Sequence, residues 1–199
     1  MTHLTPAHIA AAADRITGHI RHTPVLQVEP GALGLPYPVT LKLELTQITG
    51  SFKVRGAFNN LLSRDVPDAG VVAASGGNHG AAVAYAATKL GYKALVFVPR
   101  AIAKEEKLRR MREFGADVIL TEGSVADCMA EYAAHAEATG ALSVHPYDTA
   151  ATLAGQGTVA MEMEAQTDGF DTIMVATVGG GLIGGIDAGL GDRVRVVSD

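Results

Sequence analysis

The feature that most constrains this chain is a repeated alternation between short apolar runs and longer stretches with helical periodicity. Because a strand–helix–strand unit returns its second strand parallel to the first, this alternation predicts an α/β fold with mostly parallel sheets flanked by helices. The short runs predict strands at residues 71–74, 94–98, 117–120, 142–145, 173–177 and 194–197. The stretches between them predict helices at residues 78–90, 103–114, 125–139 and 153–166, with a last short helix after Gly181.

The chain before residue 71 is less regular. A Thr-Pro pair suits the N-cap and first turn of a helix at residues 6–18. Residues 39–45 alternate as a strand does, and a further helix is expected at residues 53–64. Prolines and glycines interrupt any periodicity in residues 21–38, which are therefore expected to be a loop.

Charge and composition exclude several classes of partner. The 199 residues carry a formal net charge of −5 and a pI near 5.8, which leaves no electrostatic footprint for nucleic acid. The one basic cluster, Arg109, Arg110 and Arg112, alternates with glutamates, as expected of a solvated helix face. No apolar run is long enough to cross a membrane and no signal peptide is recognisable, so a cytoplasmic location is expected. The single cysteine, Cys128, excludes an intrachain disulfide and is expected to be a buried thiol.

Three stretches carry chemistry, and the first is Thr49-Gly50-Ser51-Phe52-Lys53. A glycine turn here places Lys53 in the first turn of a helix, directly after an aromatic residue. Amide N–H groups at a helix N-terminus disfavour an ammonium ion, and a desolvated lysine shifts its pKa readily. Lys53 is therefore a candidate for a neutral amine that forms a Schiff base. A lone lysine on an amphipathic helix is more often solvated, so this interpretation depends on the other two stretches.

The other two stretches are glycine-rich turns between a strand and a helix. Residues 75–80 read Ser-Gly-Gly-Asn-His-Gly, and residues 178–185 read Val-Gly-Gly-Gly-Leu-Ile-Gly-Gly. Backbone N–H groups at such a junction form a cradle for a carboxylate or a phosphate, and Asn78 and His79 add side-chain donors to the first. Taken alone, the first has an ordinary explanation as a turn with Asn78 as helix cap. The second lacks the lysine and hydroxyl of a P-loop.

Together the three stretches resemble the fold-type II pyridoxal-phosphate enzymes, and in particular the serine/threonine dehydratase branch. The resemblance covers essentially the whole chain, because the motifs occur in the family's order. It also includes Lys42-Leu43-Glu44, His145-Pro146-Tyr147-Asp148 and Gly155-Gln156-Gly157-Thr158. It implies the two-lobed fold of the tryptophan synthase β-like enzymes. A larger cofactor-binding lobe would comprise residues 1–70 and 147–199, and a smaller inserted lobe residues 71–146.

The resemblance also implies a role for individual residues. Lys53 would hold pyridoxal 5'-phosphate as a Schiff base and act as the catalytic base, with Phe52 beside the pyridine ring and Asn78 bonded to the ring hydroxyl. The phosphate would be bound by backbone N–H groups of Gly179, Gly180, Gly181 and Leu182. The substrate carboxylate would be lined by Ser75, Gly77, Asn78 and His79. No residue is assigned as a metal ligand.

These roles imply β-elimination of a small hydroxy amino acid. L-Threonine or L-serine would lose its β-hydroxyl and give a 2-oxo acid and ammonia, after Lys53 removes the Cα proton. Val54-Arg55-Gly56 and Asn78-His79 resemble the dehydratases more than the cysteine synthases. Serine racemases place a serine as second base where Gly76 stands, so racemisation is less favoured. A 3-hydroxyaspartate dehydratase and a catalytically inactive binding module remain alternatives, and a homodimer is implied by the resemblance alone.

The sequence also departs from the family's pattern. Family members continue well beyond Asp199, and their continuation carries the residue that meets the pyridine nitrogen and the ligands of a cation. Val178 replaces the first glycine of a four-glycine loop, and Val197-Ser198-Asp199 replaces a Val-Glu-Pro-like ending. We therefore expect a truncated chain, in which the larger lobe exposes apolar surface and a sheet edge.

Overall fold

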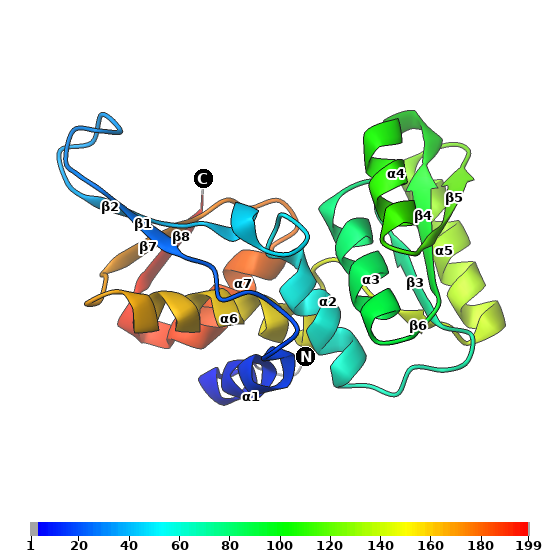
Figure 1. Ribbon diagram of the computed structural model, residues 1–199, viewed down its shortest axis with the longest axis horizontal. Coiled ribbons are helices and arrows are strands. Elements are labelled where there is room, and N and C mark those ends of the chain that lie inside the picture. Colours follow the sequence, from blue (N-terminus) through cyan, green and yellow to red (C-terminus); the bar gives the residue numbers. More distant parts are fainter. Residues whose placement is uncertain (1–3, 199) are drawn as a thin grey trace.

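Four parallel strands form the central sheet of the computed structural model, which describes residues 4–198 (Figure 1). The strands are β3 (Val71–Ala74), β4 (Ala94–Pro99), β5 (Asp117–Thr121) and β6 (Leu142–Ser143), in the order β5-β4-β3-β6 across the sheet. Valine and alanine dominate β3, where Val71, Val72 and Ala73 are almost fully buried. Such apolar runs are typical of parallel strands that are covered on both faces.

Helices cover both faces of this sheet. α3 (Asn78–Lys89) and α4 (Glu105–Glu113) pack on one face, through the alanines of α3 and through Leu108 and Met111 of α4. α5 (Val125–Thr139) packs on the other face, where its buried residues Cys128 and Tyr132 form a cluster with Phe97. This arrangement confirms the predicted α/β class and the predicted burial of the cysteine.

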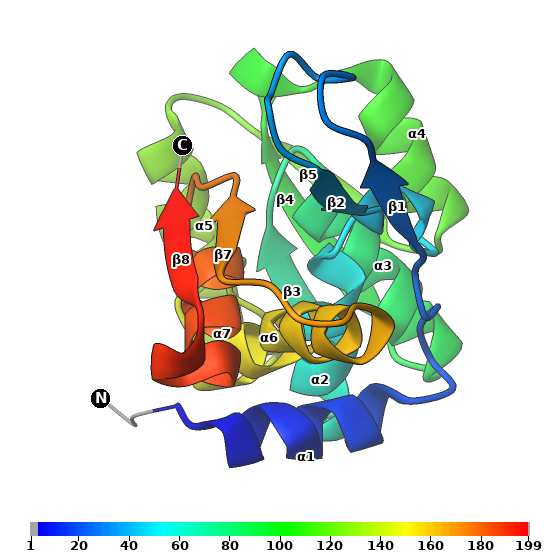
Figure 2. The ribbon, with the colours of Figure 1, turned by 90° about the vertical axis from the view of Figure 1, so that its left-hand side faces the viewer.

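Elements from both ends of the chain pack together beside this sheet. α6 (Ala150–Gln166) contacts α2 (Lys53–Leu62) and α7 (Gly181–Leu190), and α1 (Pro6–Ile16) packs against all three. Two parallel strands, β7 (Thr172–Val175) and β8 (Arg195–Ser198), lie side by side at one edge of the molecule (Figure 2). Both α2 and α7 begin at a glycine-containing turn that the sequence singles out.

Glycines let α6 approach its neighbouring helices closely. A Cβ atom on Gly155 would lie 2.6 Å from Gly56 Cα and 2.7 Å from Arg55 O, so α2 and α6 touch backbone to backbone. Gly157 and Gly185 make the same kind of contact where α6 crosses α7. Backbone atoms cannot move aside as a flexible side chain can, so these glycines fix the distances between the helices that carry the candidate site.

Every element predicted from the sequence occurs, but one strand was not predicted. β1 (Val25–Val28) lies inside the region predicted as a loop, and it pairs antiparallel with β2 (Val39–Lys42). This pairing joins segments across a turn, and a single run of four residues does not reveal it. β2 also ends before residue 45, because a 3₁₀ turn (Glu44–Thr46) directs Glu44 toward Arg55.

Other boundaries differ from the predictions by up to three residues, among them the start of α6 and the end of β6. α6 begins at Ala150, three residues early, because Thr149 Oγ1 accepts a hydrogen bond of 3.2 Å from Thr152 N and caps the helix. β6 ends at Ser143, and the chain then passes into a loop that contacts the candidate site. No helix within residues 4–198 is long and apolar enough to cross a membrane.

Candidate active site

Lys53 is the first residue of α2, and the turn before it is fixed from within. Gly50 has a φ of +70°, and its amide donates a hydrogen bond of 2.7 Å to Gln47 O. Gln47 is buried, and its side chain is bonded to both backbone polar groups of Arg21. Because residues with a Cβ rarely adopt this φ, the glycine allows the sharp entry into the helix.

The Lys53 side chain is half-buried beside an aromatic ring and a carbonyl group. Its Nζ donates a hydrogen bond of 2.8 Å to Pro146 O and lies 5.0 Å from the centroid of the Phe52 ring. Burial lowers the pKa of Lys53, because the loss of water disfavours the ammonium form. A lowered pKa enlarges the neutral fraction, which is the form of the amine that attacks a carbonyl group.

The second stretch forms the junction between β3 and α3. Asn78 begins α3 and is exposed, and Ser75 Oγ accepts a hydrogen bond of 3.1 Å from Gly77 N. A Cβ on Gly80 would lie 2.8 Å from Ser75 O, so this glycine is required for packing. A Cβ on Gly77 would meet nothing within 4 Å, so this glycine faces open space. A ligand therefore has room at Gly77 and none at Gly80.

His79 is the buried polar residue of this junction. Its Nε2 lies 2.9 Å from Val144 O, and since a carbonyl oxygen only accepts, Nε2 carries the hydrogen. Burial, and to a lesser extent the charges of Lys53 and His145, lowers the pKa of His79 to about 4. The ring is therefore neutral at pH 7, and its Nδ1 is an acceptor that has no partner within the described part of the chain.

The third stretch leads from β7 into α7. Gly180 has a φ of +79° and forms the N-cap of α7. Gly179 and Gly181 pack so closely on Tyr147 that a Cβ on either would collide with it. The first helical bond of α7 runs from Gly184 N to Gly180 O, so the amides before Gly184 are donors that an anion can use.

Apolar packing joins the third stretch to the lysine turn. Leu182 packs on a cluster of buried residues from α6, β7 and α7, which includes Val159, Ile173 and Ile186. Phe52, the residue before Lys53, packs on the same cluster. The residues predicted for the pyridine ring and for the phosphate therefore share one hydrophobic support.

A connector, residues 144–149, contacts all three stretches, although the sequence motifs alone assign it no role. Its carbonyl groups accept hydrogen bonds from His79 and Lys53, and Tyr147 packs on the glycines of the third stretch. His145-Pro146-Tyr147-Asp148 is part of the resemblance, but only the folded chain shows what it touches. The connector is the structural element that brings the predicted site residues together.

Two surface depressions of the described structure lie away from Lys53. One, of about 500 Å³, is lined by Phe170, Arg193 and the end of α6, and another, of about 320 Å³, lies between α1 and α6. Neither includes a residue of the three stretches. Within residues 4–198 no group of three metal-binding side chains gathers. The candidate site is therefore identified by its chemistry and not by its shape.

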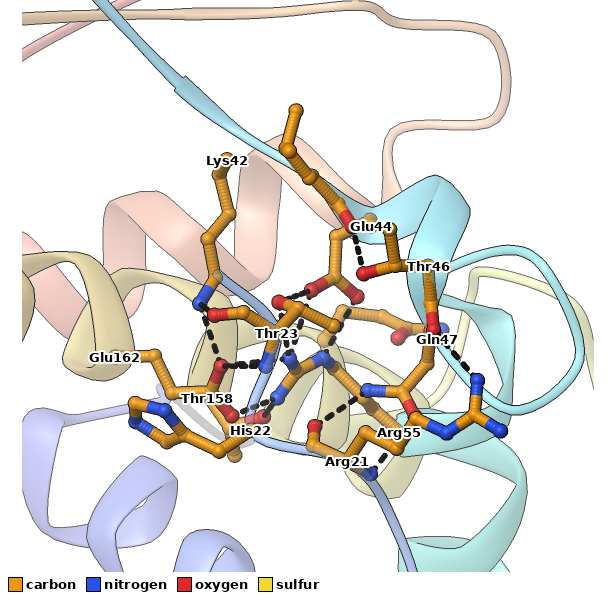
Figure 3. A network of polar contacts seen from close by, with 12 residues as sticks. Arg21, His22, Thr23, Lys42, Glu44, Thr46, Gln47, Arg55, Thr158 and Glu162 are labelled. Atoms are coloured by element: carbon orange, nitrogen blue, oxygen red, sulfur yellow. Dashed lines mark hydrogen bonds and ion pairs between the residues drawn. The ribbon is translucent and has the colours of Figure 1, made fainter. Parts of the chain in front are cut away.

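A buried ion network holds α2 through Arg55 (Figure 3). Arg55 follows Lys53 by two residues, which is about 200° around the helix, so the network lies on the side of α2 away from Lys53. Arg55 is fully buried, with Nη1 2.6 Å from Glu162 Oε1 and Nη2 2.7 Å from Glu44 Oε1. Lys42 Nζ lies 2.6 Å from Glu162 Oε2, so two cations face two carboxylates. Burial raises the pKa of Glu162, but its bonds to Arg55 and Lys42 outweigh burial and hold the pKa below its usual value. The network fixes the orientation of the helix that begins with Lys53.

A lysine of lowered pKa beside two glycine-rich strand–helix junctions suits an enzyme that acts on carbonyl and carboxylate groups. Residues 16–197 match the family described as "Pyridoxal-phosphate dependent enzyme", and the chain belongs to this family. Among solved structures, maize serine racemase has a TM-score of 0.93 and 32% identity, covering 98% of this chain and 61% of that one. A threonine deaminase, isoform 2 from Solanum lycopersicum in its processed form, has a TM-score of 0.84 and 27% identity, covering 96% and 53%. These likenesses confirm the predicted family and fold.

Curated relatives come from the same branch. The L-threonine ammonia-lyase of Geobacter sulfurreducens is 36% identical over 194 residues, which cover 95% of this chain and 48% of the relative. The L-threonine ammonia-lyase of Thermotoga maritima is 42% identical over 155 residues, covering 76% and 38%. A serine racemase of Oryza sativa is 37% identical over 180 residues, covering 89% and 53%. The chain spans about half the length of the curated relatives it matches.

The site residues fit the cofactor of this family. Lys53 would supply an amine for the carbonyl group of pyridoxal phosphate, and the start of α7 would supply amides for its phosphate. Within residues 4–198, Thr49 Oγ1, Ser51 Oγ and His79 Nδ1 are buried without a hydrogen-bond partner. Buried polar atoms are normally paired, so these three atoms of the first two stretches are available to a bound group, although Thr121 Oγ1 and Gln156 Nε2 are likewise unpaired away from these stretches.

Proposed function

We propose that this protein catalyses β-elimination of L-threonine or L-serine, giving a 2-oxo acid and ammonia. The observation that carries the proposal is the position of Lys53 Nζ, which is bonded to the connector that also contacts His79 and the third stretch. The printed names of the ammonia-lyase relatives support this reaction class. In the net reaction the β-hydroxyl leaves as water and a water molecule then replaces the amino group, so no oxidant or reductant is consumed.

Lys53 is proposed to hold the cofactor and to move the proton. Bound pyridoxal phosphate would draw electrons away from the substrate Cα. Burial favours the unprotonated amine, so Nζ can accept the Cα proton, and Pro146 O orients it. Phe52 is proposed to pack beside the cofactor ring and Asn78 to bind its hydroxyl. The phosphate is proposed to accept from the amides of Gly179, Gly180, Gly181 and Leu182.

The start of α3 is proposed to bind the substrate carboxylate. Ser75 offers a hydroxyl donor and Asn78 a side-chain amide and a backbone N–H, where the helix dipole favours an anion. Gly77, whose own N–H is bonded to Ser75 Oγ, leaves the space that the carboxylate would occupy. For the side chain of His79 we propose a different part from the one that the resemblance implies for this residue. The Nε2–H group of its ring donates to Val144 O. Nδ1 of the neutral ring is a hydrogen-bond acceptor, and a carboxylate is also only an acceptor, so the two cannot form a hydrogen bond. We therefore propose that His79 holds the junction against the connector instead of contacting the carboxylate.

Absorption spectroscopy and peptide mapping test the role of Lys53. The purified 199-residue chain is mixed with pyridoxal phosphate, its visible spectrum is recorded before and after borohydride reduction, and the reduced adduct is mapped. We expect a visible band that borohydride removes and an adduct on Lys53. Lys53→Ala should lose the band, the adduct and the release of 2-oxo acid from L-serine and L-threonine.

Lys107→Ala is the matched control, because Lys107 is an exposed lysine of α4. We expect this variant to behave as the wild type in both measurements. An adduct on a different lysine, or 2-oxo acid release by Lys53→Ala at the wild-type rate, would contradict the proposal.

Product analysis separates elimination from the alternatives. The serine racemase relatives favour racemisation, whereas Gly76 supplies no second base. A Cβ on Gly76 would lie 3.4 Å from side-chain atoms of Val98 and Ile102, so the position has room for a side chain that this chain does not provide. D-Serine formed as fast as pyruvate would favour the racemase. A cofactor adduct without product from L-serine, L-threonine or 3-hydroxyaspartate would favour a binding module.

The lobe boundaries, the assembly and the location remain predictions. We propose a larger lobe of residues 1–70 and 147–199 and a smaller lobe of residues 71–146, supported by the separate sheets of the two parts. A homodimer is proposed from the resemblance, and a cytoplasmic location is proposed from the sequence features given above. Sedimentation equilibrium tests the dimer, because a mass equal to the 20.6 kDa of one chain would contradict it.

A further inference from the structure

Arg110 departs from the role that its sequence context predicts. The sequence predicts a solvated helix face for Arg109, Arg110 and Arg112. Arg109 fits this prediction, since 71% of its side chain is exposed. Arg110 is instead half-buried, and its Nη2 donates a hydrogen bond of 2.7 Å to Thr49 O, in the turn before Lys53. One arginine of the surface cluster therefore reaches across to the candidate active site.

Gly50 and Phe114 hold the guanidinium group in place. A Cβ on Gly50 would lie 3.2 Å from Arg110 Nη2, so the group rests directly on the backbone of the turn. Phe114 follows Arg110 by four residues, and Arg110 Cζ lies 5.5 Å from the centroid of the Phe114 ring. A planar guanidinium in contact with a ring and a backbone has few alternative positions, so its bond to Thr49 O is well defined.

The contact closes a circuit that links α2, α3 and α4. Phe114, at the end of α4, meets Tyr85 of α3 edge to face at 5.3 Å, and Tyr85 meets Phe58 of α2 at 6.2 Å. From α4, Arg110 then returns to Thr49, just before the start of α2. α2 carries the lysine and α3 carries the proposed carboxylate junction, so the circuit ties together the two helices whose starts must face each other.

We propose that Arg110 is a positioning residue that clamps the turn before Lys53 to α4 and so sets where the lysine amine lies relative to the start of α3. The inference rests on the proposed role of Lys53 and adds a residue to it. Arg110 acts through the backbone of Thr49 and Gly50. Without the clamp, the turn loses its bond to the neighbouring helix and water gains access to the amine.

The clamp acts through burial and not through charge. Burial is the cause that lowers the pKa of Lys53. The titratable groups that interact with the amine are His79 on α3 and His145 in the connector, with Asp148 acting on His145. Pro146 O is the uncharged group that accepts from Nζ. Loss of Arg110 should therefore shift the titration of Lys53 by admitting water.

Trace acetylation measures this titration in the full chain without added cofactor. Each variant is labelled with trace acetic anhydride across the pH range in which lysine titrates, and acetylation of Lys53 is compared with that of exposed Lys107 in the same sample. For Arg110→Met we expect the Lys53 midpoint to rise toward the ordinary value of lysine. Each unit of this rise lowers the neutral fraction about tenfold at a fixed lower pH.

Two further variants separate the clamp from a general effect on α4. Arg109→Met should keep the wild-type midpoint, because its side chain is solvated. Arg110→Lys keeps the charge and a donor but loses the planar fork, so its midpoint should lie between those of the wild type and Arg110→Met.

The outcomes decide the proposal in every case. An Arg110→Met midpoint equal to the wild-type value, or an equal shift in Arg109→Met, would overturn it. If circular dichroism shows that Arg110→Met does not fold, the Lys53 midpoint of Arg110→Lys is compared with that of Arg109→Lys. A midpoint that is raised in Arg110→Lys alone supports the clamp, and equal midpoints overturn it. The labelling needs neither cofactor nor turnover, so it is interpretable even if the chain does not catalyse elimination. An unchanged midpoint would overturn the role of Arg110 without contradicting the role of Lys53, which the adduct experiment tests separately.

Discussion

At the scale of single residues, the burial of His79 couples stability to pH. The ordinary pKa of 6.5 falls to about 4 in the folded protein. Between these values the unfolded chain binds a proton that the folded chain does not, so stability decreases as the pH falls from about 6.5 to about 4. The upper bound of this contribution is about 3 kcal/mol. Burial also lowers the pKa of His145, which acts in the same direction.

His79→Gln separates the hydrogen bond of His79 from its titration. Glutamine keeps a side-chain amide that can donate to Val144 O, and it does not ionise. We expect unfolding free energies near those of the wild type at neutral pH and a smaller loss of stability on acidification to pH 4. Denaturant unfolding at several pH values measures this, with exposed His22→Gln as the control. A His79→Gln curve parallel to the wild-type curve through this window would show that His79 does not titrate there.

At the scale of elements, the crossing of α2 and α6 depends on the absence of side chains. The atoms nearest to a Cβ on Gly155 belong to the backbone of Gly56 and Arg55. An added methyl group must therefore separate the two helices, which shifts the first turn of α2 and Lys53 with it. The glycines of Gly-Gln-Gly-Thr in α6 thus have a packing reason that their place in a family motif does not state.

Gly155→Ala should destabilise the protein by about 1–3 kcal/mol, the usual cost of overpacking a core contact. Gly184→Ala is the matched control in α7, because its Cβ would meet only Leu153 Cδ2, at 3.3 Å, a flexible side-chain end. Alanine gains up to about 1 kcal/mol over glycine inside a helix, so the control should be neutral or stabilising. Thermal melts compare the two, and equal melting temperatures would show that α2 and α6 separate without cost.

At the scale of the whole molecule, local patterns were legible in the sequence and long-range contacts were not. β3, α3 and the glycine stretches follow from runs of neighbouring residues, so the fold class and the motif residues could be predicted. The bond from Lys53 to Pro146 joins residues 93 positions apart, and the bond from Arg110 to Thr49 joins residues 61 positions apart. No local period encodes such pairs, which is why Arg110 reads as a surface residue.

The Arg55 network is another of these long-range features. It joins Glu44, beside β2, to Glu162 near the end of α6, and both bonds meet on a fully buried guanidinium. Its charges balance, because Lys42 supplies a second cation to Glu162. Such a network adds little net stability compared with apolar packing, but removal of one member leaves an uncompensated buried charge. The network therefore enforces one arrangement of segments from the two ends of the chain.

Arg55→Met should cost about 3–5 kcal/mol of unfolding free energy near neutral pH, because Glu44 and Glu162 lose their shared cation. Arg193→Met is the control, since it removes an ion pair with Glu164 in which the side chains are 56% and 37% exposed, and it should cost at most about 1 kcal/mol.

The pH dependence of that loss distinguishes charge from packing. In the wild type the pKa of Glu162 lies below its usual value, so this carboxylate stabilises the fold above the unfolded pKa of about 4.3 and the stabilisation is lost below it. In Arg55→Met, Glu162 loses its bonds to Arg55 and keeps only Lys42, so its pKa rises above the wild-type value because burial is opposed by one cation instead of two. It then protonates at a higher pH than in the wild type, which removes the destabilising charge. We expect the difference from the wild type to shrink as the pH falls from neutral toward about 5, because protonation begins above the unfolded pKa. Denaturant unfolding at both pH values measures it, and a difference that stays constant would mean that Arg55 acts through its packing alone.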